Sequence, residues 1–261
     1  MNILEFHTVQ AAAFRILIEA LKEILTDANF EFDEHGLKIV AMDSTHTVLV
    51  HLRIHSENLE KYVCKKKLLL GINLLNFYKL MKIMGNNDIL KLYVTEENTC
   101  VLNIEIENSE KNSITKFNLN LMDLNDNKLE VPSPEFESVI TMPSIDFQKI
   151  CRDMSNIAEE IEIKSIGKQL IFSCDGQFAH QETCIGSSNN GLTFHQSDEN
   201  IIQGIYSLKY LVLFSKCTNL CNSVELFLKN DYPLITKYSI ASLGEIKLCL
   251  APKFEDEDAE N

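Results

Sequence analysis

Four neighbouring residues, Asp43, Ser44, Thr45 and His46, are of the types that build a nucleophilic triad. A triad needs its acid, base and nucleophile in mutual hydrogen-bond geometry, which neighbours along one strand-to-turn segment cannot adopt among themselves. The chain also contains no GxSxG, GxxxxGK[ST], HExxH or GxGxxG stretch, so the common signatures of hydrolases, nucleotide-binding loops and zinc proteases are missing. We therefore predict no catalytic residue and no enzyme activity.

Metal and disulfide chemistry are also poorly supported by the residue spacing. Cys217 and Cys221 are four apart, but no matching Cys or His pair follows them. His51 and His55 share one face of a strand, which is typical of an exposed polar face. Most of the eight cysteines lie in apolar surroundings, as Cys100 does between Thr and Val. We expect buried reduced thiols, no metal and no other cofactor.

Composition indicates an intracellular globular protein of unusual acidity. The 261 residues carry a net charge of −14, and five of the acids lie in the tail Glu255–Glu260, so the rest still carries −9. No apolar run approaches 18 residues and the start of the chain lacks a signal-peptide pattern, so we expect no membrane association. A simple basic DNA-binding domain is excluded, whereas an acidic protein with its positive charge gathered on one face remains open.

Short alternating apolar and polar segments, such as Thr47–Ile54 and Val101–Ile106, predict many strands. Helical spacing is limited to four segments. In the first of them Phe14, Leu17, Ile18, Leu21 and Leu25 form one apolar stripe. The expected helices, two of which follow the N-cap residues Asn73 and Ser207, are Val9–Leu25, Leu74–Met84, Ile145–Ile157 and Leu208–Cys217.

The order of these elements repeats. The first helix is followed by a strand, a turn with Gly36 and a second strand, and the third helix by the same series around Gly167. The sequence therefore predicts an α+β chain of two topologically equivalent domains, each of antiparallel sheet with two helices. Between them lies a segment rich in Pro, Asp and Asn whose apolar residues indicate that part of it is packed. The predicted divisions are 1–120, a connector at 121–136, 137–254 and an acidic tail at 255–261.

Each predicted helix carries two basic residues three or seven positions apart, which places them on one helix face. On the first helix this face lies opposite the apolar stripe, so its basic side chains are expected to point to solvent. Ordinary solvated faces would explain any single helix. A shared basic surface in so acidic a chain would instead bind phosphates without reading bases, and no aromatic residues interleave for single-strand stacking. The eight residues are Arg15, Lys22, Lys79, Lys82, Lys149, Arg152, Lys209 and Lys216.

Several segments, taken together and in order, closely resemble the proliferating cell nuclear antigen family of eukaryotic-type sliding clamps. The resemblance covers the full length, with shifts of one or two residues. The segments that carry it are Met42–His46, Gly85–Ile89, Leu121–Leu124, Met142–Ser144, Ile150–Asp153 and Leu250–Lys253.

The resemblance implies a DNA clamp fold in which three subunits close head-to-tail into a ring, with helices lining the hole. It implies a homotrimer that encircles double-stranded DNA independently of sequence, as a processivity factor for replicative DNA polymerase. The family's pore positions match the eight basic residues, although Ile16 and Asn156 stand where a basic residue or His is usual. Subunits would join through strands around Ile114–Asn120 and Phe178–Ile185, because pairing satisfies edge backbone groups.

The resemblance also implies a pocket beneath the connector for a short clamp-binding peptide carried by DNA polymerase, the clamp loader and repair proteins. Cys249 and Thr47 depart from the family's usual Tyr and Val there, and Leu49 and Val131 also suit a plain core. Expected locations are the nucleus or a site of viral DNA replication. Two alternatives remain: a subunit of a checkpoint-type hetero-clamp, and an acidic scaffold that does not bind DNA. The matching pocket positions are Met42, His46, Leu49, Leu129, Val131, Pro132, Phe136, Pro233, Ala251 and Pro252.

Overall fold

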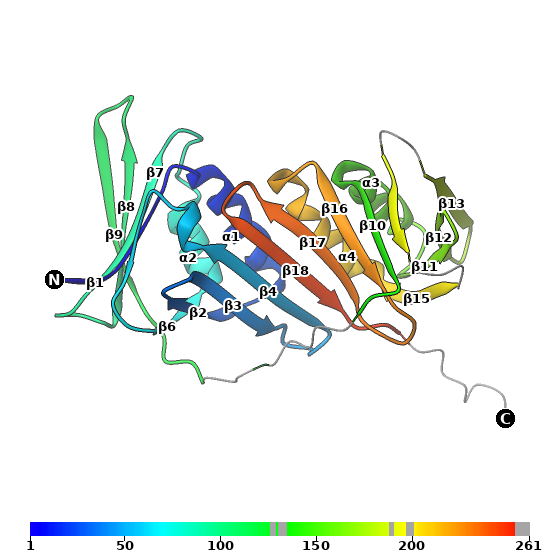
Figure 1. Ribbon diagram of the computed structural model, residues 1–261, viewed down its shortest axis with the longest axis horizontal. Coiled ribbons are helices and arrows are strands. Elements are labelled where there is room, and N and C mark those ends of the chain that lie inside the picture. Colours follow the sequence, from blue (N-terminus) through cyan, green and yellow to red (C-terminus); the bar gives the residue numbers. More distant parts are fainter. Residues whose placement is uncertain (126–128, 130–134, 188–190, 197–200, 254–261) are drawn as a thin grey trace. The chain divides into compact units, whose positions relative to one another are not determined.

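The computed structural model describes the chain except residues 126–128, 130–134, 188–190, 197–200 and 254–261 (Figure 1). The acidic tail and the predicted pocket residues Val131 and Pro132 thus lie outside the described residues. Two compact units are present, one formed by Met1–Val131 with Ser239–Lys247 and the other by Pro132–Tyr238 with Leu248–Asn261.

Both halves of the chain run through one order of elements, strand, helix, five strands, helix and three strands, which confirms the predicted repeat. The first half contains β1 Asn2–Thr8, α1 Ala11–Ile24, β2 Asp27–Asp33, β3 Gly36–Met42, β4 Val48–His55, β5 Lys61–Cys64, β6 Leu68–Asn73, α2 Leu74–Met81, β7 Ile89–Thr95, β8 Val101–Asn108 and β9 Ser113–Asn120, with the 3-10 turn η1 Ser56–Asn58. The second contains β10 Ser138–Pro143, α3 Ser144–Met154, β11 Glu160–Ile166, β12 Gln169–Asp175, β13 His180–Gly186, β14 Thr193–Gln196, β15 Ile202–Ser207, α4 Leu208–Phe214, η2 Ser215–Leu220, β16 Ser223–Leu228, β17 Leu234–Ile240 and β18 Gly244–Leu250.

Strand pairing repeats as well. In the first unit β1 pairs with β5 and β7, and β2 pairs with β3 and β6. In the second, β10 pairs with β14 and β16, and β11 pairs with β12 and β15. All of these pairs are antiparallel. The matching ladders show that one α+β fold is built twice from different side chains.

Aromatic side chains fill the core of the first unit. Phe6, Phe14, Phe30, Phe32 and Phe77 are fully buried, and their rings meet at centroid distances from 5.7 to 6.4 Å. The rings come from β1, β2, α1 and α2, so strand alternation and helical spacing deliver them to one place. In Figure 1, α1 and α2 lie together behind β2, β3 and β4 of this unit. The predicted stripe of the first helix is buried.

The four helices exist where they were predicted, but all are shorter than expected. The N-cap prediction for α2 is confirmed, because the side chain of Asn73 accepts a hydrogen bond from the N–H of Asn76 at 2.9 Å. Ser207 is the N-cap residue of α4 but makes no capping hydrogen bond through its side chain. The predicted fourth helix ends at Phe214 and continues as the 3-10 turn η2, so Lys216 is not on an α-helix.

The connector lies against the sheet of the first unit where it begins. The N–H of Met122 donates to the carbonyl of Gly71 at 2.8 Å, and Leu124 touches the same position. A Cβ on residue 71 would lie 2.2 Å from the carbonyl oxygen of Met122, so only glycine permits this approach. The prediction that part of the connector is packed is confirmed for this stretch.

The prediction that the cysteines are buried is confirmed for only some of them. Cys151, Cys174, Cys217 and Cys249 are buried, and burial raises the pKa of Cys217 to about 12. Cys100 is exposed, so the prediction that it is buried was wrong. It lies in the turn before β8, where the alternation of the strand has not yet begun.

Candidate functional site

The helices of the first unit carry two of the predicted basic pairs. Lys79 on α2 and Lys82 at its C-terminus are exposed, whereas Arg15 and Lys22 on α1 are half-buried. Lys79 lies 3.4 Å from the side-chain oxygen of Asn76, and neither Lys79 nor Lys82 pairs with any carboxylate in the described part of the chain. Two ammonium groups are therefore presented without internal neutralisation.

Lys22 is held by its neighbours. Its side chain is only 15% exposed, forms an ion pair with Glu23 and lies over the ring of Tyr78. The prediction that Lys22 points to solvent was therefore wrong, because α2 places an aromatic ring beside it. Arg15 is partly covered too, and its buried Nε has no hydrogen-bond partner among the described residues.

The second unit presents the other two pairs. Lys149 and Arg152 on α3, Lys209 on α4 and Lys216 in η2 are all exposed. Lys149, Arg152 and Lys209 make no ion pair with the described carboxylates. The buried residues Phe147 and Cys151 lie on the opposite side of α3, so the basic residues of this helix face outward.

The two strands predicted as subunit edges are terminal strands of their sheets. β9 ends the five-stranded sheet of the first unit, and β13 ends the four-stranded sheet of the second. Large apolar side chains stand at both: Ile114 is 56% exposed and Phe178, just before β13, is 77% exposed. Terminal strands with exposed apolar side chains favour pairing with another chain.

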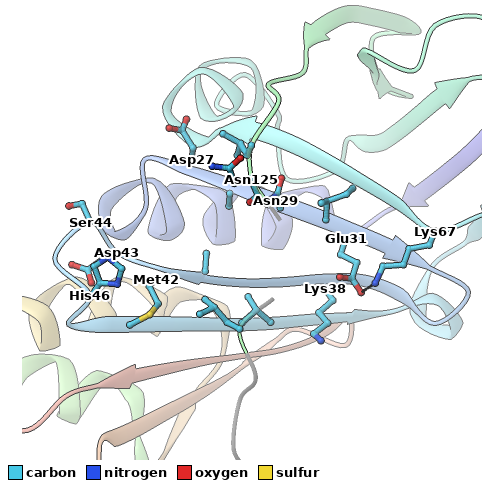
Figure 2. Close-up of a pocket in the computed structure, with 16 residues that line it drawn as sticks. Asp27, Asn29, Glu31, Lys38, Met42, Asp43, Ser44, His46, Lys67 and Asn125 are labelled. Carbon is cyan, nitrogen blue, oxygen red and sulfur yellow. Dashed lines mark hydrogen bonds and ion pairs between the residues drawn. The ribbon is translucent and has the colours of Figure 1, made fainter. Parts of the chain in front are cut away.

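A groove of about 690 Å³ crosses the outward face of β2 and β3 in the first unit, beside the connector (Figure 2). Three predicted pocket residues line it: Met42, His46 and Leu129. The connector forms the remaining wall of the groove. It is held there by a hydrogen bond from the side chain of Asn29 on β2 to the carbonyl of Asn125, at 3.2 Å. The groove therefore presents a few apolar side chains among polar and charged ones.

Asp43 builds the turn that brings His46 to this groove. Its Oδ1 accepts the N–H groups of Thr47 and Val48, each at 2.8 Å, and Thr45 donates to Oδ2. Burial would raise the pKa of Asp43, but the hydrogen bonds from Thr45, Val48 and Thr47 together outweigh it and lower the pKa. His46 adopts φ 57°, the left-handed conformation that the turn requires. The carboxylate of Asp43 therefore holds the turn together through these hydrogen bonds.

Comparison with known proteins identifies the family. The model of the proliferating cell nuclear antigen N-terminal domain matches residues 3–129, and that of the C-terminal domain matches residues 130–253. This chain belongs to the proliferating cell nuclear antigen family. One relative, named as a probable DNA polymerase sliding clamp of Paramecium bursaria Chlorella virus 1, is 38% identical over 253 residues, which are 95% of this chain and 96% of the relative.

The remaining predicted pocket positions of this family member are not all in the groove. Leu49 faces outward from β4 and is paired in register with Met42, although it does not line the groove. Among the described residues, four predicted positions belong to the second unit. There the ring of Phe136 packs on Phe227 and Tyr232 at 5.3 and 5.8 Å, and the others are half-buried: Pro233, Ala251 and Pro252.

Several groove residues escaped the sequence analysis. Asn29, Glu31 and Lys38 are outward-facing residues of β2 and β3, while Lys67 and Leu69 come from β6 and the turn before it. Strand alternation was a signal for each outward face, but which residues lie side by side depends on strand register. Register was not predictable without the pairing of β2 with β3 and β6.

Proposed function

We propose that this chain is a DNA sliding clamp, a non-enzymatic ring subunit that encircles double-stranded DNA and holds replicative DNA polymerase on it. The observation that supports this most directly is a set of exposed basic side chains without carboxylate partners among the described residues, on helices of a chain with net charge −14: Lys79, Lys82, Lys149, Arg152 and Lys209. Because the chain belongs to this family, we infer that these residues would line the inner surface of a ring.

An acidic total charge is compatible with this role because salt screens distant charges. The Debye length is about 8 Å at physiological ionic strength, so a phosphate close to a helix senses chiefly the nearest ammonium and guanidinium groups. Contacts to phosphates carry no sequence information. Such a surface would retain a duplex loosely and let it slide.

The ring is proposed to contain three copies of this chain. Backbone pairing between β9 of one copy and β13 of the next would satisfy the unpaired groups of both terminal strands and cover Ile114 and Phe178. Head-to-tail contacts of this kind close into rings. The groove at Met42, His46 and Leu129 would receive short peptides of DNA polymerase, the clamp loader and repair proteins, in the nucleus or at a site of viral DNA replication.

Loading on circular DNA tests the proposal. The full chain is incubated with a clamp loader, ATP and nicked plasmid, and the DNA-bound fraction is isolated by gel filtration. We expect retention on the circle and loss after the plasmid is cut once, because a ring slides off a free end. Equal retention on circular and cut DNA, or none on either, would contradict encirclement. Mass in solution separates a homotrimer from a subunit that needs different partners.

A further inference from the structure

The outward face of β2, β3 and β4 carries cross-strand rows of side chains. Glu31 lies opposite Lys38, and Lys38 lies opposite Arg53, so these three form one row. Val40 and His51 stand opposite each other in the next row, and Met42 and Leu49 in the row after that. Cationic side chains thus gather at one end of this face, whereas the other end combines the apolar Met42 and Leu49 with polar groove residues such as Asp43 and His46.

A cationic patch, defined as Lys38, Arg53 and Lys247 around His51, occupies the charged end. Arg53 and Lys247 have weak carboxylate partners, Asp33 at 3.9 Å and Glu245 at 3.3 Å. Lys38 has none within ion-pair distance in the described part of the chain. Its cross-strand neighbour Glu31 pairs with Lys67 instead, at 2.9 Å.

The pKa of His51 is affected by the positive charges of this patch. Its pKa is lowered, first by burial and then by the positive charges of Lys247 and Lys38, with Arg53 adding to them. Glu245 opposes the effect but does not cancel it. The electrostatic field at His51 is therefore net positive, and a further negative charge placed here would be attracted to it.

The patch adjoins the groove. Lys38 and Met42 both line it, and Figure 2 shows Lys38, Glu31 and Lys67 at one end and Met42, Asp43 and His46 at the other. Met42 lies four positions after Lys38 on β3, which is roughly 13 Å along an extended strand. An extended peptide whose apolar anchor lies near Met42 would therefore reach the patch about four residues away.

We propose that the cationic patch selects client peptides that carry acidic side chains about four residues from the apolar anchor held near Met42 and Leu129. The proposal rests on the proposed function, since it assumes that the groove receives client peptides. Charge complementarity supports an acidic occupant, because Lys38 lacks a carboxylate partner among the described residues. The carboxylates of the bound peptide would replace Asp33 and Glu245 as partners of Arg53 and Lys247. Little stability would be lost, because such exposed ion pairs contribute little to it.

Three synthetic peptides test this. They share one anchor segment, with a Gln and two aromatic residues, and differ in having four Glu after the anchor, four Glu before it, or four Gln on both sides. Binding to the intact protein is measured by calorimetry at low salt. We expect one acidic peptide to bind about fivefold tighter than the neutral one, as two or three exposed ion pairs would give. Which of the two acidic peptides binds more tightly will show in which direction the peptide runs along the groove.

Matched variants localise the effect. In Lys38→Gln/Arg53→Gln the acidic peptide should lose its advantage while the neutral peptide binds as before. Lys111→Gln/Lys168→Gln, which removes two exposed charges elsewhere, should leave the advantage intact. In wild type, the acidic peptide should raise the pKa of His51 measured by NMR, and the neutral peptide should not.

Equal affinity of all three peptides for wild type would overturn the proposal, and so would an advantage that survives in Lys38→Gln/Arg53→Gln. If no peptide binds, the peptide groove fails together with this inference. Retention on circular DNA would still report on the clamp itself, so the two failures are distinguishable.

Discussion

The ammonium group of Lys22 on α1 lies over the ring of Tyr78 on α2, with Nζ 4.8 Å from the ring centroid. Burial and a hydrogen bond to Glu19 raise the pKa of Tyr78, so its hydroxyl remains a donor. Glu19 and Lys22 lie three residues apart on α1. One tyrosine of α2 thus engages an acid and a base of the neighbouring helix, and it determines how a proposed DNA-facing lysine is presented.

The ring of Tyr78, more than its hydroxyl, should hold Lys22. Tyr78→Phe keeps the ring and Tyr78→Leu removes it, so the leucine variant should be less stable than the phenylalanine variant by about 0.5–1 kcal/mol. Chemical denaturation measures this difference. The ε-methylene protons of Lys22 should show a ring-current shift in wild type and Tyr78→Phe that disappears in Tyr78→Leu. Identical shifts in all three proteins would mean that the contact does not form in solution.

Leu129 should anchor client peptides. Leu129→Ala is expected to weaken the binding of a family-type peptide by about 1–3 kcal/mol, as truncation in a desolvated hot spot does. Pro252→Ala should have an effect of the same order. Leu75→Ala, which removes an exposed leucine on α2, provides the control. Calorimetry that gives wild-type affinity for both Leu129→Ala and Pro252→Ala would remove this assignment.

Asp43 should stabilise the protein in a pH-dependent way. Its folded-state pKa is lowered from the ordinary value of 3.8, so its stabilisation is fully present above that value and is lost as pH falls through the lowered pKa. Asp43→Asn should cost about 1.5–3 kcal/mol at neutral pH, because a charged acceptor of several hydrogen bonds is lost. The variant should also show a flatter acid limb in denaturation midpoints measured from pH 6 down to about pH 3. An unchanged limb would show that Asp43 does not titrate with folding.

Local periodicity was enough to predict the helices and the repeat. The stripe that contains Phe14 and Leu21 follows the 3.6-residue spacing, and the order of elements survives the low identity between halves. The fate of single side chains was not predictable in this way. The cover over Lys22 comes from Tyr78, 56 positions along the chain, through packing of α1 on α2. Sequence spacing gives the face of a helix and not the neighbour that covers it.

Strand register explains why the sequence analysis did not predict several groove residues. Lys38 could be assigned to an outward face from alternation, but its position between Glu31 and Arg53 depends on how β2, β3 and β4 align. The Asp43–His46 segment illustrates the same limit. Its residue types suggested chemistry, whereas the backbone N–H groups that occupy the carboxylate of Asp43 are visible only in the folded turn.

The exposed apolar side chains at the terminal strands should stabilise the ring. Ile114→Asp and Phe178→Asp each place a charge where a neighbouring subunit would bury apolar surface, so both should shift the trimer toward monomer. Ile201→Asp, at another exposed isoleucine, should leave the trimer intact. Light scattering at micromolar concentration measures the mass. A wild-type protein that is monomeric under these conditions would refute the homotrimer.

The basic residues of α2 provide the most direct test of DNA contact. Lys79→Glu/Lys82→Glu removes two cations that pair with no described carboxylate and adds two anions, while the aromatic core of the first unit is untouched. Because phosphate contacts weaken steeply with charge and salt, the half-life on nicked circular DNA should fall by about tenfold. Stimulation of a polymerase should fall with it, and the difference from wild type should shrink as salt rises, because salt screens the altered charges.

A matched variant separates contact from net charge. Lys66→Glu/Lys111→Glu makes the protein equally more acidic at two exposed positions that are not on the helices. Since charges beyond a Debye length of about 8 Å are screened, this variant should retain DNA nearly as wild type does. Both variants should keep the trimer mass, because none of the four lysines lies in β9 or β13. Equal retention by the two variants would mean that overall charge, and not a surface formed by the helices, governs the interaction, and the assignment of the eight basic residues to DNA would then fail.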